Sequence, residues 1–245
     1  MGPAEVAPAL VIPAGFRVQS QPMDPREDEK RAAAQAAAML VEDGMLLGLG
    51  TGTTVAHFLP AVAARGLGGL RCLATSDGTA EAARALGLQL QAFDLRDRLD
   101  LAVDGADQVA PDLWLVKGGG GAHTREKVMA AAADRFVVIV SGDKLVERLG
   151  PPVPLEVMRF GLRATLRHLR ERGPTRLRDA PPTPDGNVLV DFGAPVEEPA
   201  ALAAALEAIP GVVGHGLFPS ALVSAVLVGR ADGSVQRLDA APAHT

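Results

Sequence analysis

Short runs rich in apolar residues alternate with helix-type segments along the first 150 residues of the chain. The apolar runs lie at 45–47, 70–75, 88–93, 101–103, 113–116 and 136–140. Several of them are apolar at successive positions, which is typical of parallel strands buried on both faces. Helix-type segments separate them. They lie at 24–41, after the loop 48–54 through about residue 64, at 80–86 and at 124–133. This alternation predicts an α/β fold with an open, mainly parallel sheet and helices on both faces.

The first two helices carry local signals. Asp24 is a favourable N-cap, Pro25 suits the first helical position, and Glu27 places an acid in the first turn. The alanine-rich run that follows has high helix propensity and small side chains, which allow close packing on a sheet. Pro60 is expected to kink or shorten the second helix, because proline has no backbone N–H to donate.

The pattern changes near residue 150, where three prolines fall close together. Beyond them the sequence predicts strand 153–157, helix 159–171, strand 175–178, strand 187–192, helix 197–209 and strand 212–218. This βαββαβ order predicts a smaller, ferredoxin-like α+β domain over residues 151–220.

The two ends of the chain complete the predicted organisation. The runs 222–228 and 234–238, joined by Asp232 and Gly233, predict a hairpin that returns to the first domain. The first domain, expected to be the catalytic one, therefore comprises residues 24–150 together with 221–240. Residues 1–23 are interrupted by Pro3, Pro8 and Pro13 and have no basic residue before Arg17, which makes a poor signal peptide. We expect them to form a mobile extension.

Composition narrows the classes of partner. The 245 residues are 48% hydrophobic and 22% charged, as in ordinary globular proteins. The net charge is −5 and the chain has no long basic run, so nucleic acid is not an expected partner. The basic residues between Arg163 and Arg178 are interpreted as one solvated helix face and the strand after it. No apolar run reaches the roughly eighteen residues that span a membrane. The single cysteine, Cys72, excludes an intrachain disulfide and fits a reducing compartment, the cytoplasm.

The candidate chemistry is concentrated between residues 101 and 127. The run 101–103 ends on Asp104 and Asp107, and the run 113–116 ends on Lys117 and four glycines. Strand ends of this kind place their charges at the carboxyl edge of a sheet, where open α/β folds bind ligands. The helix that follows contains Glu126 in its first turn, and its N-terminal N–H groups point toward the same place.

A second glycine-containing loop, 48–54, contains Thr51, Thr53 and Thr54 between a strand and a helix. Backbone N–H groups and hydroxyls in such a loop form a plausible cradle for a phosphate group. A dinucleotide-binding fingerprint would require glycine at position 53, and a P-loop would require lysine after the glycines, so both fit poorly. The strand 136–140 also ends on charge, at Asp143 and Lys144.

These side chains favour proton transfer on a small phosphorylated molecule. The five histidines do not have metal-ligand spacing, and no serine or cysteine has an evident histidine partner. Abstraction of a proton next to a carbonyl requires a carboxylate base and a cation or donor for the developing enediolate. It requires neither a metal nor an organic cofactor.

Four segments closely resemble ribose-5-phosphate isomerase of the A type. They are GLGTGTT (48–54), SDGTA (76–80), VDGAD (103–107) and KGGGGAHTREK (117–127). FDL (93–95), PLEV (154–157), DGNVLVDF (185–192) and IPGVVGHGLF (209–218) extend the likeness, which runs from about residue 28 to 238. The resemblance implies interconversion of ribose 5-phosphate and ribulose 5-phosphate through a cis-enediol, in the pentose phosphate pathway. It also implies a homodimer or homotetramer that acts without a metal.

The resemblance also implies roles for individual residues. Glu126 would be the base, Asp104 and Asp107 would lie against the sugar and assist ring opening, and Lys117 would stabilise the enediolate oxygen. The rest of the substrate site would comprise Thr51, Gly52, Thr53, Thr54, Gly105, Ala106, Gly118, Gly119, Gly120 and Lys144. Lys30 would add positive charge near the phosphate.

Three positions depart from the family pattern, and other functional classes compete. Gln108 stands where glutamate is typical, Asp143 where serine is usual and His215 where asparagine is common. The loss of a negative charge at Gln108 is expected to alter the pKa values of the neighbouring acids. A sugar-phosphate sensor would keep the pocket but usually carries a DNA-binding helical domain, which the proline-rich N-terminus does not offer. CoA transferases and amino-sugar phosphate deaminases share a related fold, but the motifs argue against both.

Overall fold

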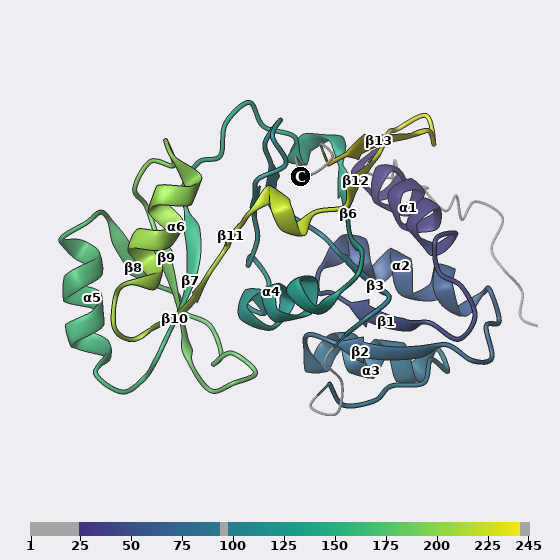
Figure 1. Cartoon of the computed structure of the whole chain (residues 1–245), viewed down its shortest axis with the longest axis horizontal. Helices are drawn as coiled ribbons and strands as arrows, with labels where there is room; N and C mark the ends of the chain where they lie inside the picture. The colour runs from purple at the N-terminus through teal and green to yellow at the C-terminus, as the bar shows by residue number, and fades with distance from the viewer. Residues whose placement is uncertain (1–24, 94–97, 241–245) are drawn as a thin grey trace, which may run out of the picture.

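A computed structural model describes residues 25–93 and 98–240. Within these residues the largest sheet has six strands in the order β13-β12-β6-β3-β1-β2 (Figure 1). The strands are β1 (Leu46–Leu49), β2 (Arg71–Ala74), β3 (Leu101–Asp104), β6 (Phe136–Ser141), β12 (Ala225–Gly229) and β13 (Val235–Asp239). All neighbouring pairs are parallel except the β12–β13 hairpin. The mainly parallel sheet and the returning hairpin are therefore confirmed.

Helices cover both faces of this sheet. The helices are α1 (Pro25–Ala38), α2 (Thr53–Ala63), α3 (Asp77–Ala85) and α4 (His123–Ala132). On one face α1, α2 and α3 pack against a layer that includes Leu47 and Val103. On the other face α4 packs against the alternate positions, such as Ala102 and Val138. The period of two along each buried strand thus divides the core into two layers.

The start of one helix and the effect of Pro60 on another differ from the sequence prediction. Helix α3 begins at Asp77, three residues early, because the Ser76 hydroxyl caps it by accepting the Thr79 N–H. Helix α2 passes through Pro60 and ends at Ala63. Pro60 is exposed, so the carbonyl that its missing N–H leaves unpaired is on the solvent side of the helix.

Two predicted strands are not part of the parallel sheet. The segment 88–93 forms only an isolated bridge between Leu90 and Cys72, on the outer side of β2. The run 113–116 supplies β5 (Leu115–Val116), which pairs antiparallel with β4 (Gln108–Val109) and β11 (Leu217–Phe218) in a separate three-stranded sheet. The connection from β3 to β5 is too short for a parallel crossover, so the chain folds back as a hairpin instead.

The second half of the chain forms a four-stranded antiparallel sheet in the order β10-β7-β9-β8, at the left of Figure 1. Its elements are β7 (Val153–Val157), α5 (Leu162–Arg170), β8 (Thr175–Leu177), β9 (Val188–Phe192), α6 (Pro199–Glu207) and β10 (Val212–His215). This is the predicted ferredoxin-like βαββαβ arrangement. We call it the small sheet.

The predicted strand 212–218 is divided between two sheets. Its first part is β10 and its second part is β11, with Gly216 between them. A Cβ at Gly216 would lie 2.0 Å from the Lys117 carbonyl oxygen, so only glycine allows this close passage. The chain here joins the small sheet to the three-stranded sheet beside Lys117.

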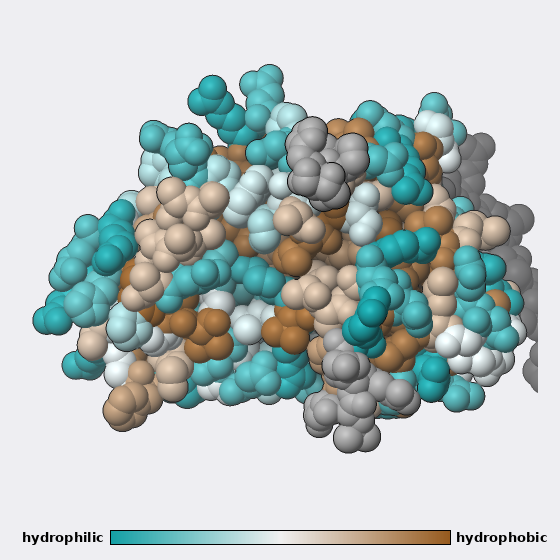
Figure 2. All heavy atoms as spheres, in the orientation of Figure 1, coloured by the Kyte–Doolittle hydropathy of each residue, from teal (hydrophilic) through white to brown (hydrophobic). Residues whose placement is uncertain are grey.

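The surface of α5 has the solvated character expected from the sequence. Arg163, Arg167 and Arg170 are exposed on it, and hydrophilic residues cover the left edge of Figure 2, where α5 lies. Two short 3₁₀ helices, η1 (Gly142–Lys144) and η2 (Ser220–Leu222), follow β6 and β11. Within residues 25–93 and 98–240, no helix is long and apolar enough to cross a membrane. The predicted extension 1–23 is outside the described residues, and the domain boundaries stay predictions.

Candidate active site

A cavity of about 280 Å³ lies beyond the carboxyl ends of β1, β3 and β6. Its wall consists of residues from three loops, the first turns of α2 and α4, and η1: Thr51, Gly52, Thr53, Thr54, Gly105, Ala106, Asp107, Lys117, Gly118, Gly119, Gly120, Glu126 and Lys144. Sequence reasoning had placed each of them in the substrate or catalytic site. We call this space the site cavity. Of the predicted site residues, Asp104 and Lys30 are not part of its wall.

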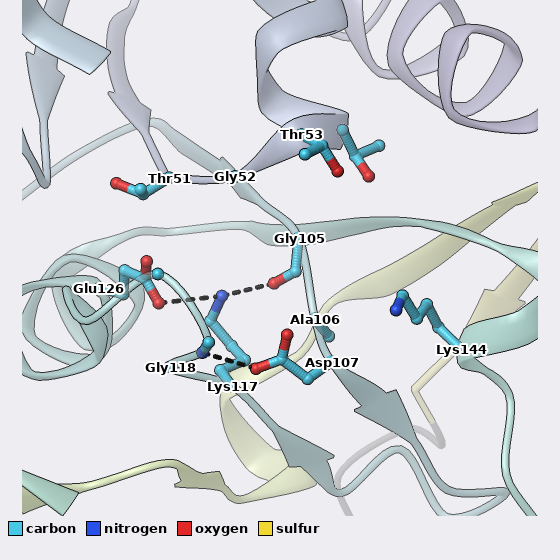
Figure 3. A pocket seen from close by; sticks show the side chains of 13 residues that line it. Thr51, Gly52, Thr53, Gly105, Ala106, Asp107, Lys117, Gly118, Glu126 and Lys144 are labelled. Atoms are coloured by element: carbon cyan, nitrogen blue, oxygen red, sulfur yellow. Dashed lines mark hydrogen bonds and ion pairs between the residues drawn. The ribbon is translucent and has the colours of Figure 1, made fainter. Parts of the chain in front are cut away.

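Three charged side chains, those of Asp104, Lys117 and Glu126, form a buried ion cluster at one end of the cavity. Figure 3 shows Lys117 and Glu126. Lys117 Nζ is 2.8 Å from Asp104 Oδ2 and 3.2 Å from Glu126 Oε2, and it also donates to the Gly105 carbonyl. The three side chains are only 2–4% exposed. Enclosure of this kind strengthens each electrostatic interaction, because water does not screen it.

The ion cluster shifts the pKa of each member. Burial, and next the negative charge of Asp104, raise the pKa of Glu126 to about 8, against the opposing effect of Lys117. Burial alone would lower the pKa of Lys117, but Asp104 and Glu126 outweigh it and hold that pKa above its usual value. Burial raises the pKa of Asp104, and Lys117 opposes the shift. The lysine is therefore a firm cation beside a carboxyl of unusually high basicity.

Asp104 holds the cluster together from behind the cavity wall. Its Oδ1 accepts the N–H groups of Thr51 at 3.1 Å and Gly105 at 2.7 Å, while Oδ2 faces Lys117. A Cβ at Gly50 would lie 2.0 Å from the carboxyl carbon, so the β1 loop approaches Asp104 closely only because residue 50 is glycine. Both carboxylate oxygens are engaged, so this geometry suits positioning of Lys117 better than direct contact with a sugar.

Asp107, in contrast, lines the cavity itself. Its Oδ2 accepts the Gly119 N–H at 2.8 Å, and its side chain extends from the β3–β4 loop toward the glycine loop (Figure 3). The two acids that the sequence places three residues apart therefore have different surroundings. One is buried behind the lysine, and the other is presented to a ligand.

The opposite end of the cavity suits an anion. Helix α2 begins at Thr53, and its N-cap Gly52 forms no side-chain cap, so the first N–H groups of the helix remain open to a ligand. Thr53, Thr54 and Lys144 line the cavity here, and Figure 3 shows Lys144 across the cavity from Glu126.

The Thr51 hydroxyl does not belong to the predicted cradle of three hydroxyls. It lies 2.8 Å from the Thr75 hydroxyl and 2.9 Å from that of Ser76, and in Figure 3 it points away from the labelled residues of the cavity. Two hydroxyls, those of Thr53 and Thr54, therefore remain for an anion. Thr51 instead joins the loops that follow β1 and β2.

The positions that depart from the family pattern have local partners. The Gln108 amide both donates to and accepts from the backbone of Gly150, so it anchors that loop. Asp143 accepts the Ser141 hydroxyl and lies 3.7 Å from Lys144 Nζ. His215 lies 2.9 Å from Glu207. Lys30 forms an ion pair with Glu27 at 2.6 Å, away from the cavity wall.

One residue at the site was missed by sequence reasoning. Arg178 donates to the carbonyls of Gly118 at 2.9 Å and Gly119 at 3.3 Å and is only 17% exposed. The interpretation of residues 163–178 as solvated is therefore wrong for Arg178. A usable signal was the acid at Asp191 in the apolar run 188–192, because an inward-facing acid needs a cationic partner.

Among the described residues, no group of three or more His, Cys, Asp or Glu side chains is placed to hold a metal ion. Whether catalysis proceeds without a metal stays a prediction.

The chain is similar to a family of sugar phosphate isomerases. A family described as "Ribose 5-phosphate isomerase A (phosphoriboisomerase A)" matches residues 71–233. Ribose-5-phosphate isomerase A of Caulobacter vibrioides (strain NA1000 / CB15N) is 47% identical over 222 residues, 86% of this chain and 97% of that protein.

Solved structures show the same similarity. Ribose 5-phosphate isomerase A of Methanocaldococcus jannaschii has a TM-score of 0.82 at 36% identity, over 87% of this chain and 99% of that one. A D-ribose-5-phosphate isomerase in complex with phospho-erythronic acid has a TM-score of 0.81 at 34% identity, with the same coverage of 87% and 99%.

Proposed function

The chain belongs to the ribose 5-phosphate isomerase A family, and we propose that it interconverts ribose 5-phosphate and ribulose 5-phosphate in the site cavity. One observation carries the proposal. A carboxyl of raised pKa and a firmly charged lysine, Glu126 and Lys117, lie 3.2 Å apart at one end of a cavity whose other end suits an anion. An aldose phosphate has a reacting carbonyl at one end and a phosphate at the other, so it matches both ends.

The phosphate is placed by the N-terminus of α2. Thr53 and Thr54 provide hydroxyls and open backbone N–H groups, and Lys144 provides a positive charge on the other side. Binding at this end directs the open-chain sugar toward Lys117 and Glu126. Asp107, on the wall between them, is placed to exchange a hydroxyl proton while the sugar ring opens.

The proton transfer then follows from the ion cluster. Glu126 removes the proton from C2 of the aldose, the electron pair forms a C1–C2 double bond, and the carbonyl pair moves to O1. The hydroxyl proton on O2 passes to O1, the pair on O2 forms the new carbonyl, and Glu126 returns its proton to C1. No atoms are gained or lost, and one carboxyl performs both transfers.

Lys117 stabilises the negative oxygen of the intermediate. Asp104, the Gly105 carbonyl and Glu126 surround its ammonium group before reaction. When Glu126 takes up a proton it loses its charge, so the N–H that faces it becomes available to the enediolate. The favourable interaction thus strengthens as the intermediate forms, which is the condition for lowering the barrier.

A relative solved with phospho-erythronic acid supports this assignment of the site. That compound carries a carboxylate where the sugar phosphate has its reacting carbons, and two adjacent oxygens bearing negative charge resemble an enediolate. We propose that the same compound binds this chain with its carboxylate at Lys117 and its phosphate at Thr53, Thr54 and Lys144.

A direct assay tests the proposal. Purified protein should convert ribose 5-phosphate to the ketose and should not convert ribose, which lacks the phosphate. Activity should survive exhaustive treatment with EDTA, because Lys117 supplies the positive charge. A preparation that binds ribose 5-phosphate without producing ketose would support a sugar-phosphate sensor instead, and activity that depends on an added divalent ion would rule out the metal-free mechanism.

We also propose a homodimer or homotetramer in the cytoplasm, as the family resemblance implies. With Cys72 as its single cysteine the chain forms no intrachain disulfide, which fits a reducing compartment. Light scattering on the purified protein would measure the assembly, and a monomer at micromolar concentration would reject the oligomer.

A further inference from the structure

The guanidinium of Arg178 contacts the glycine loop from the side opposite the site cavity. Arg178 directly follows β8 in the small sheet. Its guanidinium donates to the carbonyls of Gly118 and Gly119, 60 and 59 residues away along the chain. Asp191 on β9 fixes the side chain, with Nε and Nη2 each 2.7 Å from Oδ1. A charged side chain at 17% exposure, with both partners in place, is held in one orientation.

These contacts determine where the N–H groups of the loop point. In a trans peptide group the carbonyl and the next residue's N–H point in opposite directions. The Gly118 carbonyl faces Arg178, and the Gly119 N–H accordingly points the other way, to Asp107 at 2.8 Å. The Gly119 carbonyl also faces Arg178, so the Gly120 N–H points away from it as well.

The side away from Arg178 is the site cavity. Gly119 and Gly120 line that cavity on one side, and on the other they line a second hollow of about 240 Å³ to which Arg178 belongs. The glycine loop is therefore a thin wall between the two. No acceptor within residues 25–93 and 98–240 is recorded for the Gly120 N–H, which leaves this donor for a ligand.

We propose that Arg178 is a positioning residue that aligns two successive peptide groups of the glycine loop with their N–H groups toward the substrate. The first N–H holds Asp107 in place, and the second donates to a substrate oxygen. This inference rests on the proposed function and gives the small sheet a part in it. A glycine loop has many accessible conformations, so an external clamp is needed to keep both donors directed at the cavity.

Arg176 provides a matched control. It lies two residues before Arg178 and also pairs with Asp191, at 3.0 Å, but it is 80% exposed and no contact with the glycine loop is recorded for it. Replacing either arginine removes an ion pair with Asp191. Only replacement of Arg178 also removes the contact with the glycine loop.

The experiment compares Arg178→Lys and Arg178→Met with Arg176→Lys and Arg176→Met. We expect kcat/KM to fall about 10- to 100-fold in Arg178→Met, the scale of a misplaced reacting group. Arg178→Lys should recover only part of the loss, because an ammonium group cannot bridge two carbonyls and a carboxylate as a planar fork does. Both Arg176 variants should stay within about twofold, the effect expected of an exposed ion pair.

Further measurements separate positioning from a general loss of structure. Affinity for phospho-erythronic acid should fall in the Arg178 variants at an unchanged melting temperature, while the pH dependence set by the charges of the ion cluster stays the same. Millimolar guanidinium should partly restore Arg178→Ala and leave Arg176→Ala unaffected. Equal activities and affinities at the two positions would overturn the inference, as would losses at Arg178 that follow the melting temperature.

Hydrogen exchange distinguishes this inference from the proposed function. The Gly119 amide, bonded to Asp107, should exchange faster in Arg178→Met than in Arg176→Met, whether or not the wild-type protein is an isomerase. Inactive wild-type protein with this difference in exchange rejects the proposed function alone. Active wild-type protein without it rejects the role of Arg178 alone.

Discussion

Two lysines approach the same aromatic ring in different electrostatic surroundings. Lys117 Nζ is 5.4 Å and Lys127 Nζ is 5.2 Å from the centroid of Phe218. Lys117 has two carboxylates beside it, and they hold its pKa above the usual value despite burial. Lys127 contacts a histidine, His215, at 3.2 Å, and burial lowers the pKa of this lysine to about 8.

The difference shows that neighbouring charge, more than burial or the aromatic ring, decides whether a buried ammonium group keeps its proton. His215 is itself held neutral, because burial and then Lys127 lower its pKa to about 4. Glu207, the carboxylate partner of His215, is 65% exposed, and its charge raises the pKa of Lys127 without outweighing burial. Lys117 thus keeps its charge where the reaction needs one, whereas Lys127, ten residues further along the chain, loses its charge near pH 8.

The largest expected effect concerns the carboxyl that distinguishes the two surroundings. Glu126→Gln keeps the size of the side chain but cannot accept a proton, so kcat should fall by about 10²- to 10⁴-fold. Steady-state kinetics would measure this, with thermal melting to confirm folding. Glu207→Gln, beside the other lysine, should leave kcat nearly unchanged. Retention of more than about a tenth of kcat in Glu126→Gln would move the base assignment to Asp107 or Asp104.

Replacing each lysine in turn tests the comparison directly. Lys117→Ala should lower kcat by about 10²- to 10³-fold, the typical effect of removing a group that stabilises an oxyanion. Lys117→Arg should not fully restore it, since a planar fork does not replace a compact charge within this cluster. Both should be assayed alongside a thermal melt, because Lys117→Ala leaves two buried carboxylates without a counter-charge. Equal turnover in Lys117→Ala and Lys127→Ala would contradict the distinction between them.

The sequence was sufficient to predict most of the cavity wall. Polar residues such as Lys117 and Lys144 follow apolar strands, and the ends of neighbouring strands meet at one edge of a sheet. The parallel sheet and the ferredoxin-like order followed from apolar periodicity in the same way. These features depend on local pattern, which a sequence shows directly.

What the sequence did not predict depends on contacts between distant segments. The Thr51 hydroxyl turns to Thr75 and Ser76 because the segment that follows β2 offers hydroxyl partners there. Asp104 lies behind the lysine, and Arg178 reaches the glycine loop across 60 residues. The direction of a loop side chain is set by such partners, and composition gives no sign of them.

The pH dependence of turnover should report the ion cluster. Because Glu126 must be ionised to act, kcat/KM should rise with pH toward a plateau, with an apparent pKa of about 8. Asp104→Asn removes the like charge that raises the pKa of Glu126, so the rise should shift to lower pH. Because Glu126 binds its proton more tightly in the folded protein than in the unfolded chain, this proton stabilises the fold. The contribution is complete below about pH 4.5, the pKa in the unfolded chain, and is lost as the pH rises through 8. An unshifted profile in Asp104→Asn would show that another group controls the rise.

The smallest effect concerns Lys127 and the stability of the fold. Its pKa is about 8 in the folded protein and near the ordinary 10.5 in the unfolded chain. Between these values the unfolded state binds more protons, so the contribution of Lys127 to stability rises as the pH increases from 8 to 10.5. Below pH 8 a charged ammonium group is buried without a carboxylate, at a cost in free energy. Lys127→Met removes that cost, so the variant should melt at a higher temperature than wild type at pH 7, with the difference shrinking by pH 10.

Melting curves from pH 7 to pH 10 would measure this difference, and Val128→Met, at an exposed neighbouring position, is the control. A variant that melts lower at pH 7 would show that contacts with His215 and Phe218 compensate the burial of Lys127, and the contrast between the two lysines would then be one of degree.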